Sequence, residues 1–407
     1  MFYKKTIRDV PLDGQCVLLR ADYNVPLEDG EIDDDYRLQQ SLPTLRHLLD
    51  RGCHVVICSH LGRPKGEVKP EFSLEPVAAR LGELLDKPVG FISDCVGDRV
   101  FQATKRMTPG QVLLLENLRF HPEEEANDPE FAQALAQASG AAYFVEDGFG
   151  VVHRAHASTE AITHYLPSVA GLLLENEITT ITDAMENPKR PLVAILGGAK
   201  VSEKLQLINR FVGLADRLVI GGAMANTFLA YKGLPIGKSI YEPGQDAVLE
   251  QIYAKALQKC QGKCSVDEFL LLPTDVVVAK SLDEDAVSRS IAVQDVAEDD
   301  YILDIGMGTA KHAGDTLQNA GTVIWNGTLG MAEHAAYAAA SAYIARSIAQ
   351  QKDSLVSIIG GGDTADFVLH WDEQKGGSFT HVSTGGGASL ELMAGQKLPG
   401  VEALLDA

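Results

Sequence analysis

Basic residues are scarce in this chain of 407 residues. It has 35 Lys and Arg against 56 Asp and Glu, so its formal net charge is -21 at pH 7. Such an acidic balance argues against general binding to nucleic acid or to anionic membranes. An anionic ligand would therefore need a local cluster of basic side chains.

Cysteines are also few, and the spacing of the six does not pair them for a disulfide framework. In a chain of this length, this pattern is typical of reduced thiols in a cytosolic protein. Cys260 and Cys264, in "CQGKC", have no second pair of ligands, which disfavours a structural metal site. The sequence has no run near the roughly 18 apolar residues of a membrane span, and its first residues lack an apolar signal region. We therefore expect a cytoplasmic protein.

Two common nucleotide-binding fingerprints are absent. The Walker pattern G-x-x-x-x-G-K-[ST] does not occur. The segment "ILDIGMGT" (302–309) is similar to the start of a dinucleotide-binding or methyl-donor loop, but Lys311 breaks G-x-G-x-x-G. The next apolar run, "TVIWNG", ends in Asn-Gly instead of the ribose-binding acid expected about 20 residues on. A dehydrogenase or methyltransferase is therefore only a third alternative.

Short runs rich in Val, Ile and Leu alternate with helical stretches along the chain. This alternation predicts parallel sheets wrapped by helices, and the length allows two to three domains of roughly 150 residues. We predict an α/β fold with two doubly wound, Rossmann-like domains, joined by a hinge helix after a boundary near residue 170. We expect "FLLLPTDVVVA" (269–279) and "YILDIG" (301–306) to be strands of the second sheet.

Cationic and hydrogen-bonding residues follow several predicted strands of the first half. They occur at Arg37 and in "RADYN" (20–24), "SHLGRP" (59–64), "ENLRFH" (116–121) and "HRAHAST" (153–159). Ligands of open α/β sheets bind beyond the carboxyl ends of strands. Guanidinium groups donate bidentate hydrogen bonds to phosphate and carboxylate oxygens, whereas Asp22 and Asn24 are suited to bind a ligand hydroxyl. Each arginine alone is more often a solvated residue, but together they predict a site for a small polyanion. His153 and His156 are expected either to be structural or to support the ligand-binding side chains from behind.

Three glycine loops follow predicted strands of the second half: "GGAKVSEK" (197–204), "GGGDT" (360–364) and "STGGGAS" (383–389). Backbone N–H groups in such loops, and the positive ends of the helices after them, favour phosphate oxygens. Lys200 and Lys204 are four residues apart, so we expect them to share one helical face and to meet the same phosphate chain. Asp363 suits Mg²⁺ and is also compatible with an N-cap. These loops predict a nucleotide site.

These segments, taken together, resemble the phosphoglycerate kinase family over essentially the whole chain. The motifs that carry the resemblance are "LLRADYNVPL", "SHLGRP", "LLLENLRFH", "FGVVHRAHAST", "AILGGAKVSEKLQLI", "WNGTLGMAE" and "IIGGGDT", in the family's order and approximate spacing. The resemblance implies that residues 1–170 bind phosphoglycerate, that 171–388 bind the nucleotide, and that 389–407 return to the first domain.

The resemblance also implies a set of site residues. Those implied to hold 3-phosphoglycerate or its bisphosphate are Asp22, Tyr23, Asn24, Arg37, His60, Leu61, Gly62, Arg63, Arg119 and Arg154. Those implied to hold ATP or ADP are Gly198, Lys200, Lys204, Asn326, Glu333, Gly361, Gly362, Asp363 and Thr364. Glu333 would meet the ribose and Asp363 the Mg²⁺ ion, and the implied catalytic residues are Arg37, Lys200 and Gly386.

The implied activity is reversible phosphoryl transfer between 1,3-bisphosphoglycerate and MgADP, a step of glycolysis and gluconeogenesis. In the reverse direction the nucleophile is a carboxylate, ionised at pH 7, so alignment and positive charge are needed more than a general base. Two ligands on separate domains would meet by closure about a hinge near residues 170–190.

Three loops depart from the family's usual pattern. "EDGFGVV" (146–152) has Glu and Gly where the family more often has Asn and Ala. "WNGTLG" (325–330) has Thr in place of a usual Pro, and "DIGMGT" (304–309) replaces a Gly-Pro form. A non-catalytic nucleotide-binding or scaffold protein on the same fold is the main alternative. We expect a monomer.

Overall fold

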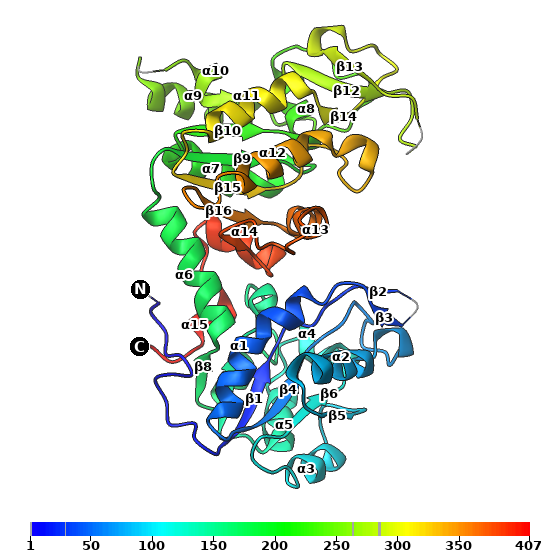
Figure 1. The fold of residues 1–407 in the computed structure, drawn as a ribbon, viewed down its shortest axis with the longest axis vertical. Coiled ribbons are helices and arrows are strands. Elements are labelled where there is room, and N and C mark those ends of the chain that lie inside the picture. Colours follow the sequence, from blue (N-terminus) through cyan, green and yellow to red (C-terminus); the bar gives the residue numbers. More distant parts are fainter. Residues whose placement is uncertain (1, 29, 263, 284–285) are drawn as a thin grey trace. The chain divides into compact units, whose positions relative to one another are not determined.

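The computed structural model describes all residues except 1, 29, 263 and 284–285. The chain divides into two compact units, residues 1–179 with 396–407, and residues 180–395. The division falls inside helix α6 (Leu172–Glu186). Each unit has its own parallel sheet with helices packed on it, which confirms the predicted α/β fold with two domains (Figure 1).

The sheet of the first unit has six parallel strands in the order β5-β6-β4-β1-β7-β8. Their bounds are β1 Cys16–Arg20, β4 His54–Cys58, β5 Val89–Ile92, β6 Val112–Leu115, β7 Tyr143–Glu146 and β8 Ser168–Ala170. The chain runs outward from β1 in one direction and then returns to add β7 on its other side. This reversal places a topological switch point at the carboxyl ends of the central strands.

Alternate residues of β1 enter two hydrophobic cores on opposite faces of this sheet. Val17 and Leu19 pack in one core with residues of α1 and α2, and Leu18 packs in the other with residues of α3 and α5. The helices of this unit are α1 Tyr36–Asp50, α2 Glu75–Leu85, α3 Asp98–Thr104, α4 Pro122–Glu125, α5 Pro129–Ser139 and α15 Pro399–Glu402. Because successive strand side chains point to opposite faces, the all-buried run "CVLLR" fits a strand covered on both sides.

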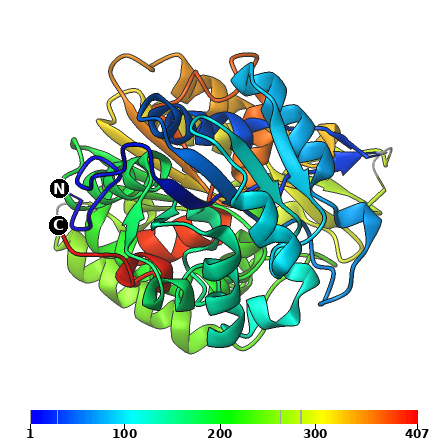
Figure 2. The same ribbon diagram turned by 90° about the horizontal axis from the view of Figure 1, so that it is seen from below.

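The two ends of the chain are joined within the first unit. The N–H of Lys5 donates to the carbonyl of Leu405 over 2.8 Å, and the N–H of Leu405 donates to the carbonyl of Ser168 over 3.0 Å. Figure 1 and Figure 2 both show the termini side by side. A short hairpin, β2 (Leu27–Glu28) with β3 (Glu31–Ile32), completes the strands of this unit.

The second unit has its own sheet of six parallel strands, in the order β11-β10-β9-β15-β16-β17. Their bounds are β9 Leu192–Leu196, β10 Arg217–Ile220, β11 Leu270–Leu271, β15 Thr322–Asn326, β16 Val356–Gly360 and β17 His381–Val382. The helices are α7 Val201–Leu214, α8 Gly222–Tyr231, α9 Asp246–Cys260, α10 Val266–Phe269, α11 Met307–Leu317, α12 Ala339–Ala349, α13 Gly362–Trp371 and α14 Gly386–Met393.

Two segments expected in this parallel sheet lie elsewhere. The run 269–279 is divided, because Pro273 has no N–H for a ladder and lies between β11 and β12 (Asp275–Ala279). β12 pairs antiparallel with β13 (Arg289–Ala292) and with β14 (Tyr301–Ile305) in a separate three-stranded sheet. The prediction that these segments join the second parallel sheet was therefore wrong for β12 and β14.

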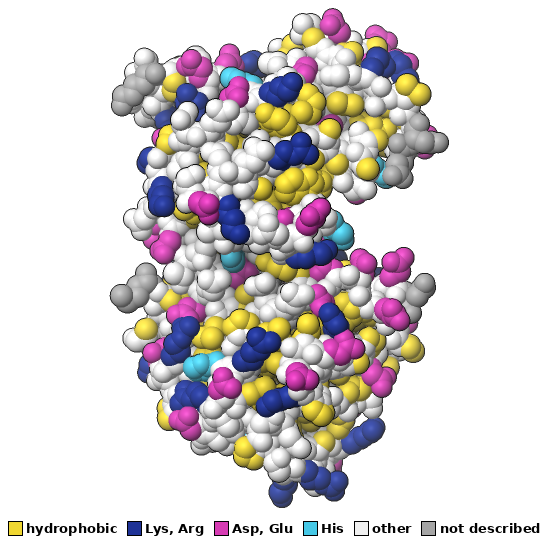
Figure 3. Space-filling view, in the orientation of Figure 1, with side chains coloured by type: hydrophobic (Ala, Val, Ile, Leu, Met, Phe, Trp, Pro, Cys, Tyr) yellow, Lys and Arg dark blue, Asp and Glu magenta, His cyan; other side chains and the backbone are white. Residues whose placement is uncertain are grey.

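Charged side chains of both signs are interspersed over the face shown in Figure 3. Within the described parts of the chain, no helix combines the length and the apolar character that a membrane crossing requires.

Candidate active site

The basic segments of the first unit meet where neighbouring strands end. β6, β4, β1 and β7 are consecutive in the sheet, and the four segments follow them. Arg37, on α1, donates from Nη1 to Oδ2 of Asp22 over 2.8 Å, while 28% of its side chain remains exposed. Asp22 thus orients this guanidinium and leaves its other donors available to a ligand.

Arg119 lies in a single turn of 3-10 helix (Leu118–Phe120) whose N-cap is Asn117. Its Nη1 donates to the carbonyl of Gly62 over 2.8 Å, and its Nε lies 3.3 Å from Oε1 of Glu125. Burial lowers the pKa of Arg119, and the positive charges of Arg20 and Arg154 lower it further. Guanidinium groups that disfavour one another's charge create a positive potential suited to an anion.

His60 is buried beside these arginines. Its Nδ1 is 3.2 Å from Nη2 of Arg20, and since a guanidinium can only donate, we assign Nδ1 as the acceptor and place the proton on Nε2. Burial, followed by the charges of Arg20, Arg119 and Arg37, holds the pKa of His60 well below its usual range. His60 is therefore a neutral hydrogen-bonding group within a cationic cluster.

Four further residues expected at this site shape it in different ways. Oδ1 of Asn24 accepts from the N–H of Gly62 over 2.8 Å. Gly62 has φ of +62°, and a Cβ there would lie 2.4 Å from the Phe72 ring. Tyr23 is buried and its hydroxyl pairs with Oγ of Ser41 at 2.9 Å, so its ring belongs to the core. Leu61 is likewise buried.

Arg63 is exposed and Arg154 is half-buried. Neither guanidinium has a hydrogen bond or ion pair to any residue that the structure describes, so both remain available to a ligand. His153 and His156 flank Arg154, and burial lowers the pKa of His153 to about 4 and that of His156 to about 3. Both imidazoles are therefore neutral near pH 7.

Arg20, which belongs to the cationic segment 20–24 but was not expected among the ligand-binding residues, is almost fully buried at the end of β1. Its Nε donates to Oγ of Ser158 over 2.9 Å, and that hydroxyl donates to Oε1 of Glu124 over 2.6 Å. Arg20 thus connects strand β1 to the segment that carries Arg154. A charged residue that ends an otherwise apolar strand was the available signal.

The glycine loops of the second unit follow the carboxyl ends of β9, β16 and β17, and β15 lies between β9 and β16 in the sheet. Gly198 and Gly361 have φ of +107° and +87°, a region that favours glycine. A Cβ on Gly386, at the start of α14, would lie 3.1 Å from the N atom of Gly362, at the start of α13. Two helix N-termini therefore approach each other beside these loops.

The two lysines differ in environment. Lys204 is half-buried, and its Nζ donates to the carbonyl of Gly197 (2.8 Å), the carbonyl of Asn326 (3.0 Å) and Oδ1 of Asn326 (2.7 Å). Burial lowers the pKa of Lys204 to about 8, although the charge of Asp363 opposes this effect. Lys200 is the extended N-cap residue of α7 and is exposed, with its Nζ 2.9 Å from Oε1 of Glu203. The two ammonium groups do not share a helical face in this structure.

Asn326 and Thr364 lie beneath the same loops. The N–H of Gly327 donates to Oγ1 of Thr364 over 2.6 Å. Among the described residues, Nδ2 of Asn326 is buried without a hydrogen-bond partner. A buried amide donor without a partner is costly, so this group is a candidate to meet a ligand oxygen.

A pocket opens beside the loops and is lined by Gly198, Asp363 and the exposed Glu333. Apolar side chains that the sequence did not assign form its walls: Ile240, Val276, Leu303, Leu329 and Met331. Apolar walls with a few polar groups are typical of small-molecule sites. Gly222, with φ of +62°, also lines the pocket, and the Gly-Gly turn that contains it was the available signal.

The residues at this edge fit a magnesium ion bound together with phosphates. Asp363 lies in the first turn of α13, exposed and facing the pocket. Mg²⁺ is usually held by one or two carboxylates, with phosphate oxygens and water as its other ligands. One accessible carboxylate beside predicted phosphate loops matches that donor set.

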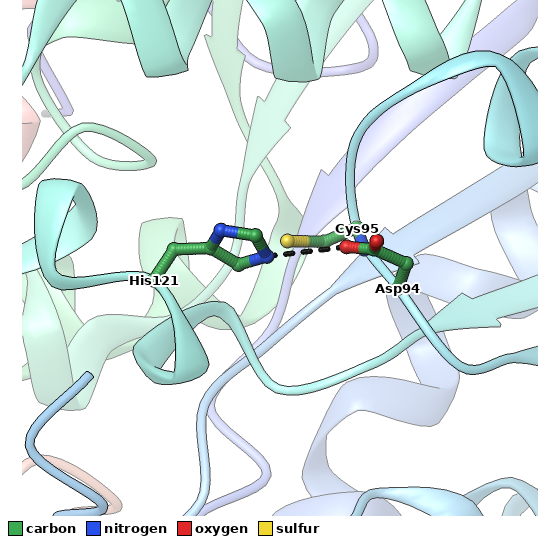
Figure 4. A group of neighbouring side chains, drawn as sticks. All are labelled: Asp94, Cys95 and His121. Atoms are coloured by element: carbon green, nitrogen blue, oxygen red, sulfur yellow. Dashed lines mark hydrogen bonds and ion pairs between the residues drawn. The ribbon is translucent and has the colours of Figure 1, made fainter. Parts of the chain in front are cut away.

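A second group of potential ligands, Asp94, Cys95 and His121, lies in the first unit (Figure 4). Nε2 of His121 is 3.1 Å from Oδ1 of Asp94, which accounts for their proximity. Burial raises the pKa of the Cys95 thiol well above its usual range. Because metal ligation requires the thiolate, we interpret this group as a hydrogen-bonded His–Asp pair beside a buried thiol.

Comparisons with known proteins agree with this geometry. The family model described as phosphoglycerate kinase matches residues 7–396. The phosphoglycerate kinases of Moorella thermoacetica and Chloroherpeton thalassium are 47% and 48% identical to this chain, over 99% of it and 99% and 100% of their own lengths. The solved structure of phosphoglycerate kinase from Coxiella burnetii is 36% identical, with a TM-score of 0.82 and 98% of both chains covered. The chain therefore belongs to the phosphoglycerate kinase family.

Proposed function

We propose that this chain transfers a phosphoryl group reversibly between 1,3-bisphosphoglycerate and ADP, giving 3-phosphoglycerate and ATP. One observation supports the proposal most. An arginine cluster suited to a small polyanion stands at the carboxyl edge of one sheet, and glycine loops suited to phosphates stand at the carboxyl edge of the other. A kinase with two anionic ligands needs both.

In the first unit, we propose that Arg63, Arg119 and Arg154 bind the phosphate of phosphoglycerate. Their guanidinium groups supply forked, charge-assisted hydrogen bonds. The neutral His60 and the carboxylate of Asp22 are suited to the ligand's hydroxyl. Asn24 acts mainly by holding the N–H of Gly62.

In the second unit, we propose that the loops at Gly198, Gly361 and Gly386 hold the phosphates of ATP or ADP. Backbone N–H groups at the starts of α13 and α14 are suited to anionic oxygens. The apolar pocket beside them would take the base, and Glu333 the ribose. Asp363 would hold Mg²⁺, which offsets the negative charge of the phosphates when it is bound.

The transferred group needs positive charge and alignment instead of a general base. Arg37 keeps donors free beyond its bond to Asp22, and the exposed Lys200 forms a surface ion pair with Glu203. Both can therefore turn to the migrating group, while Gly386 offers a helix N-terminus. Since the two proposed sites belong to different units, transfer requires the ligands to be brought together, and we propose that α6 supplies the hinge. We also propose that the protein acts as a cytoplasmic monomer.

The test is ATP consumption with 3-phosphoglycerate and Mg²⁺, coupled to NADH oxidation, with Arg37→Ala as the comparison. Turnover by the native chain and its loss in Arg37→Ala would support the proposal. Absence of turnover in the native chain, with ATP still bound in calorimetry, would favour a non-catalytic nucleotide-binding protein instead.

A further inference from the structure

Two cysteine sulfurs are in contact in the second unit. Sγ of Cys264 lies 2.7 Å from Sγ of Cys260, the last residue of α9. Gln261 and Gly262 have φ of +41° and +78°, and these left-handed conformations turn the chain back on itself after the helix. Ser265 then begins α10 with a capping box. The contact between the two thiols therefore lies where α9 ends and the chain leads toward α10.

The two thiols differ in access. Cys260 is buried, and burial followed by its hydrogen bond with Cys264 raises its pKa to about 11. Cys264 is partly exposed. The four remaining cysteines are buried, and none of them has a sulfur–sulfur hydrogen bond in the described parts of the chain. Since a disulfide bond measures about 2.05 Å, the Cys260 and Cys264 sulfurs, 2.7 Å apart, lie close to bonding distance.

We propose that Cys260 and Cys264 form a reversible disulfide when the protein meets hydrogen peroxide. The Cys264 thiolate attacks one peroxide oxygen, the O–O bond breaks, and the leaving hydroxide takes up the thiol proton as water, which leaves a sulfenic acid. The Cys260 sulfur then attacks the sulfenic sulfur and the S–O bond breaks. The released hydroxide takes the Cys260 proton as a second water, so peroxide is reduced as two thiols are oxidised.

The disulfide closes a loop of only a few residues, so it constrains the unfolded chain little and adds little stability. Such a bond is readily reversed by small thiols. Cys260 also lies within the electrostatic influence of Arg217, at the amino end of β10. The glycine loops stand at the opposite, carboxyl ends of the strands. The modification is therefore independent of the proposed catalytic function.

The test treats the reduced full-length protein with hydrogen peroxide. Thiols are then counted with a chromogenic disulfide reagent after denaturation, and the intact mass is measured. We expect the count to fall from six to four, the mass to decrease by two hydrogen atoms, and dithiothreitol to reverse both changes. Trypsin cleaves after Lys259 and Lys263, so the two cysteines should appear in separate peptides joined by the disulfide.

Two variants assign the bond. Cys264→Ser should lose no hydrogen atoms under the same treatment, whereas Cys16→Ser, in the first unit, should lose two like the native chain. Retention of all six thiols would overturn the proposal. A disulfide mapped to other cysteines would overturn it too, as would oxidation that only adds oxygen.

Discussion

The backbone N–H of Gly148 donates a hydrogen bond of 2.8 Å to Oε1 of Glu146, at the end of β7. Glu146 is fully buried; burial raises its pKa well above the usual range, and the charge of Arg20 opposes this effect. A Cβ on residue 148 would lie 3.1 Å from that Oε1 and 3.3 Å from Cγ2 of Val151. The Glu146 side chain therefore has room only because residue 148 is glycine and carries no Cβ. A shorter side chain at position 146 would leave space for a Cβ at position 148.

We predict that Gly148→Ala destabilises the chain by about 1 to 3 kcal/mol, the usual cost of overpacking. The double variant Glu146→Asn with Gly148→Ala should recover most of that loss, because the shorter amide leaves room for the methyl. Urea unfolding of the native chain, both single variants and the double variant gives the coupling energy. Additive effects of the two substitutions would show that the residues are independent.

We predict that the stability of the fold depends on pH because Asp147 is a buried carboxyl group with a raised pKa. Its Oδ1 accepts from the N–H groups of Leu173 (2.9 Å) and Leu174 (3.2 Å) at the start of α6, and burial raises its pKa to about 7. Between about pH 4 and pH 7 the folded carboxyl binds more protons than the unfolded one. Its contribution to stability is therefore full at low pH and is lost as the pH rises through 7.

Asp147→Asn keeps the oxygen acceptor and removes the buried charge. We expect this variant to be more stable than the native chain near pH 8, by at most about 4 kcal/mol given the size of the pKa shift. The difference should shrink as the pH falls toward 5. Urea unfolding at several pH values measures it, and a difference that does not vary with pH would contradict the assigned titration.

Regular features of the fold could be predicted from the sequence, because buried parallel strands are continuous apolar runs followed by small or polar residues. The strands around Pro273 were harder to predict, because two short strands that belong to different sheets lie within one apolar run. Periodicity reports burial and does not report which strand is the partner.

The same limit applies to the candidate site: its place in the sheet could be predicted, but individual side-chain contacts could not. Segments at strand ends were found because the topology brings all such ends to one edge. Lys204 shows the limit, because sequence spacing placed it beside Lys200, while the structure turns it inward onto three protein oxygens. Arg20 was expected in the cationic segment 20–24, but its contacts could not be predicted because Ser158 and Glu124 are far away in the sequence.

For Arg119→Ala we predict binding of 3-phosphoglycerate weaker by about tenfold or more, since charge-assisted hydrogen bonds contribute about 1.5 to 3 kcal/mol. ATP affinity should not change, because Gly62 and Glu125, the partners of the Arg119 guanidinium, belong to the first unit. Calorimetry with each ligand measures both. Arg99→Ala, an exposed arginine of the same unit that bonds to Ser93, is the matched control and should bind both ligands normally. Loss of ATP affinity in Arg119→Ala would reverse our assignment of ligands to units.

Lys200 offers the sharpest test of the catalytic assignment. Its ammonium is exposed and pairs with Glu203 in the first turn of α7, a contact of little energetic value, so it can leave that carboxylate at small cost. We predict that Lys200→Ala lowers kcat by on the order of 10² while KM for ATP stays nearly unchanged, as expected for a contact made mainly in the transition state. Steady-state kinetics at saturating 3-phosphoglycerate measures both constants, with the exposed Lys352 replaced by Ala as the control. A rise in KM with kcat intact would instead assign Lys200 to ground-state nucleotide binding, because equal stabilisation of substrate and transition state leaves kcat unaffected.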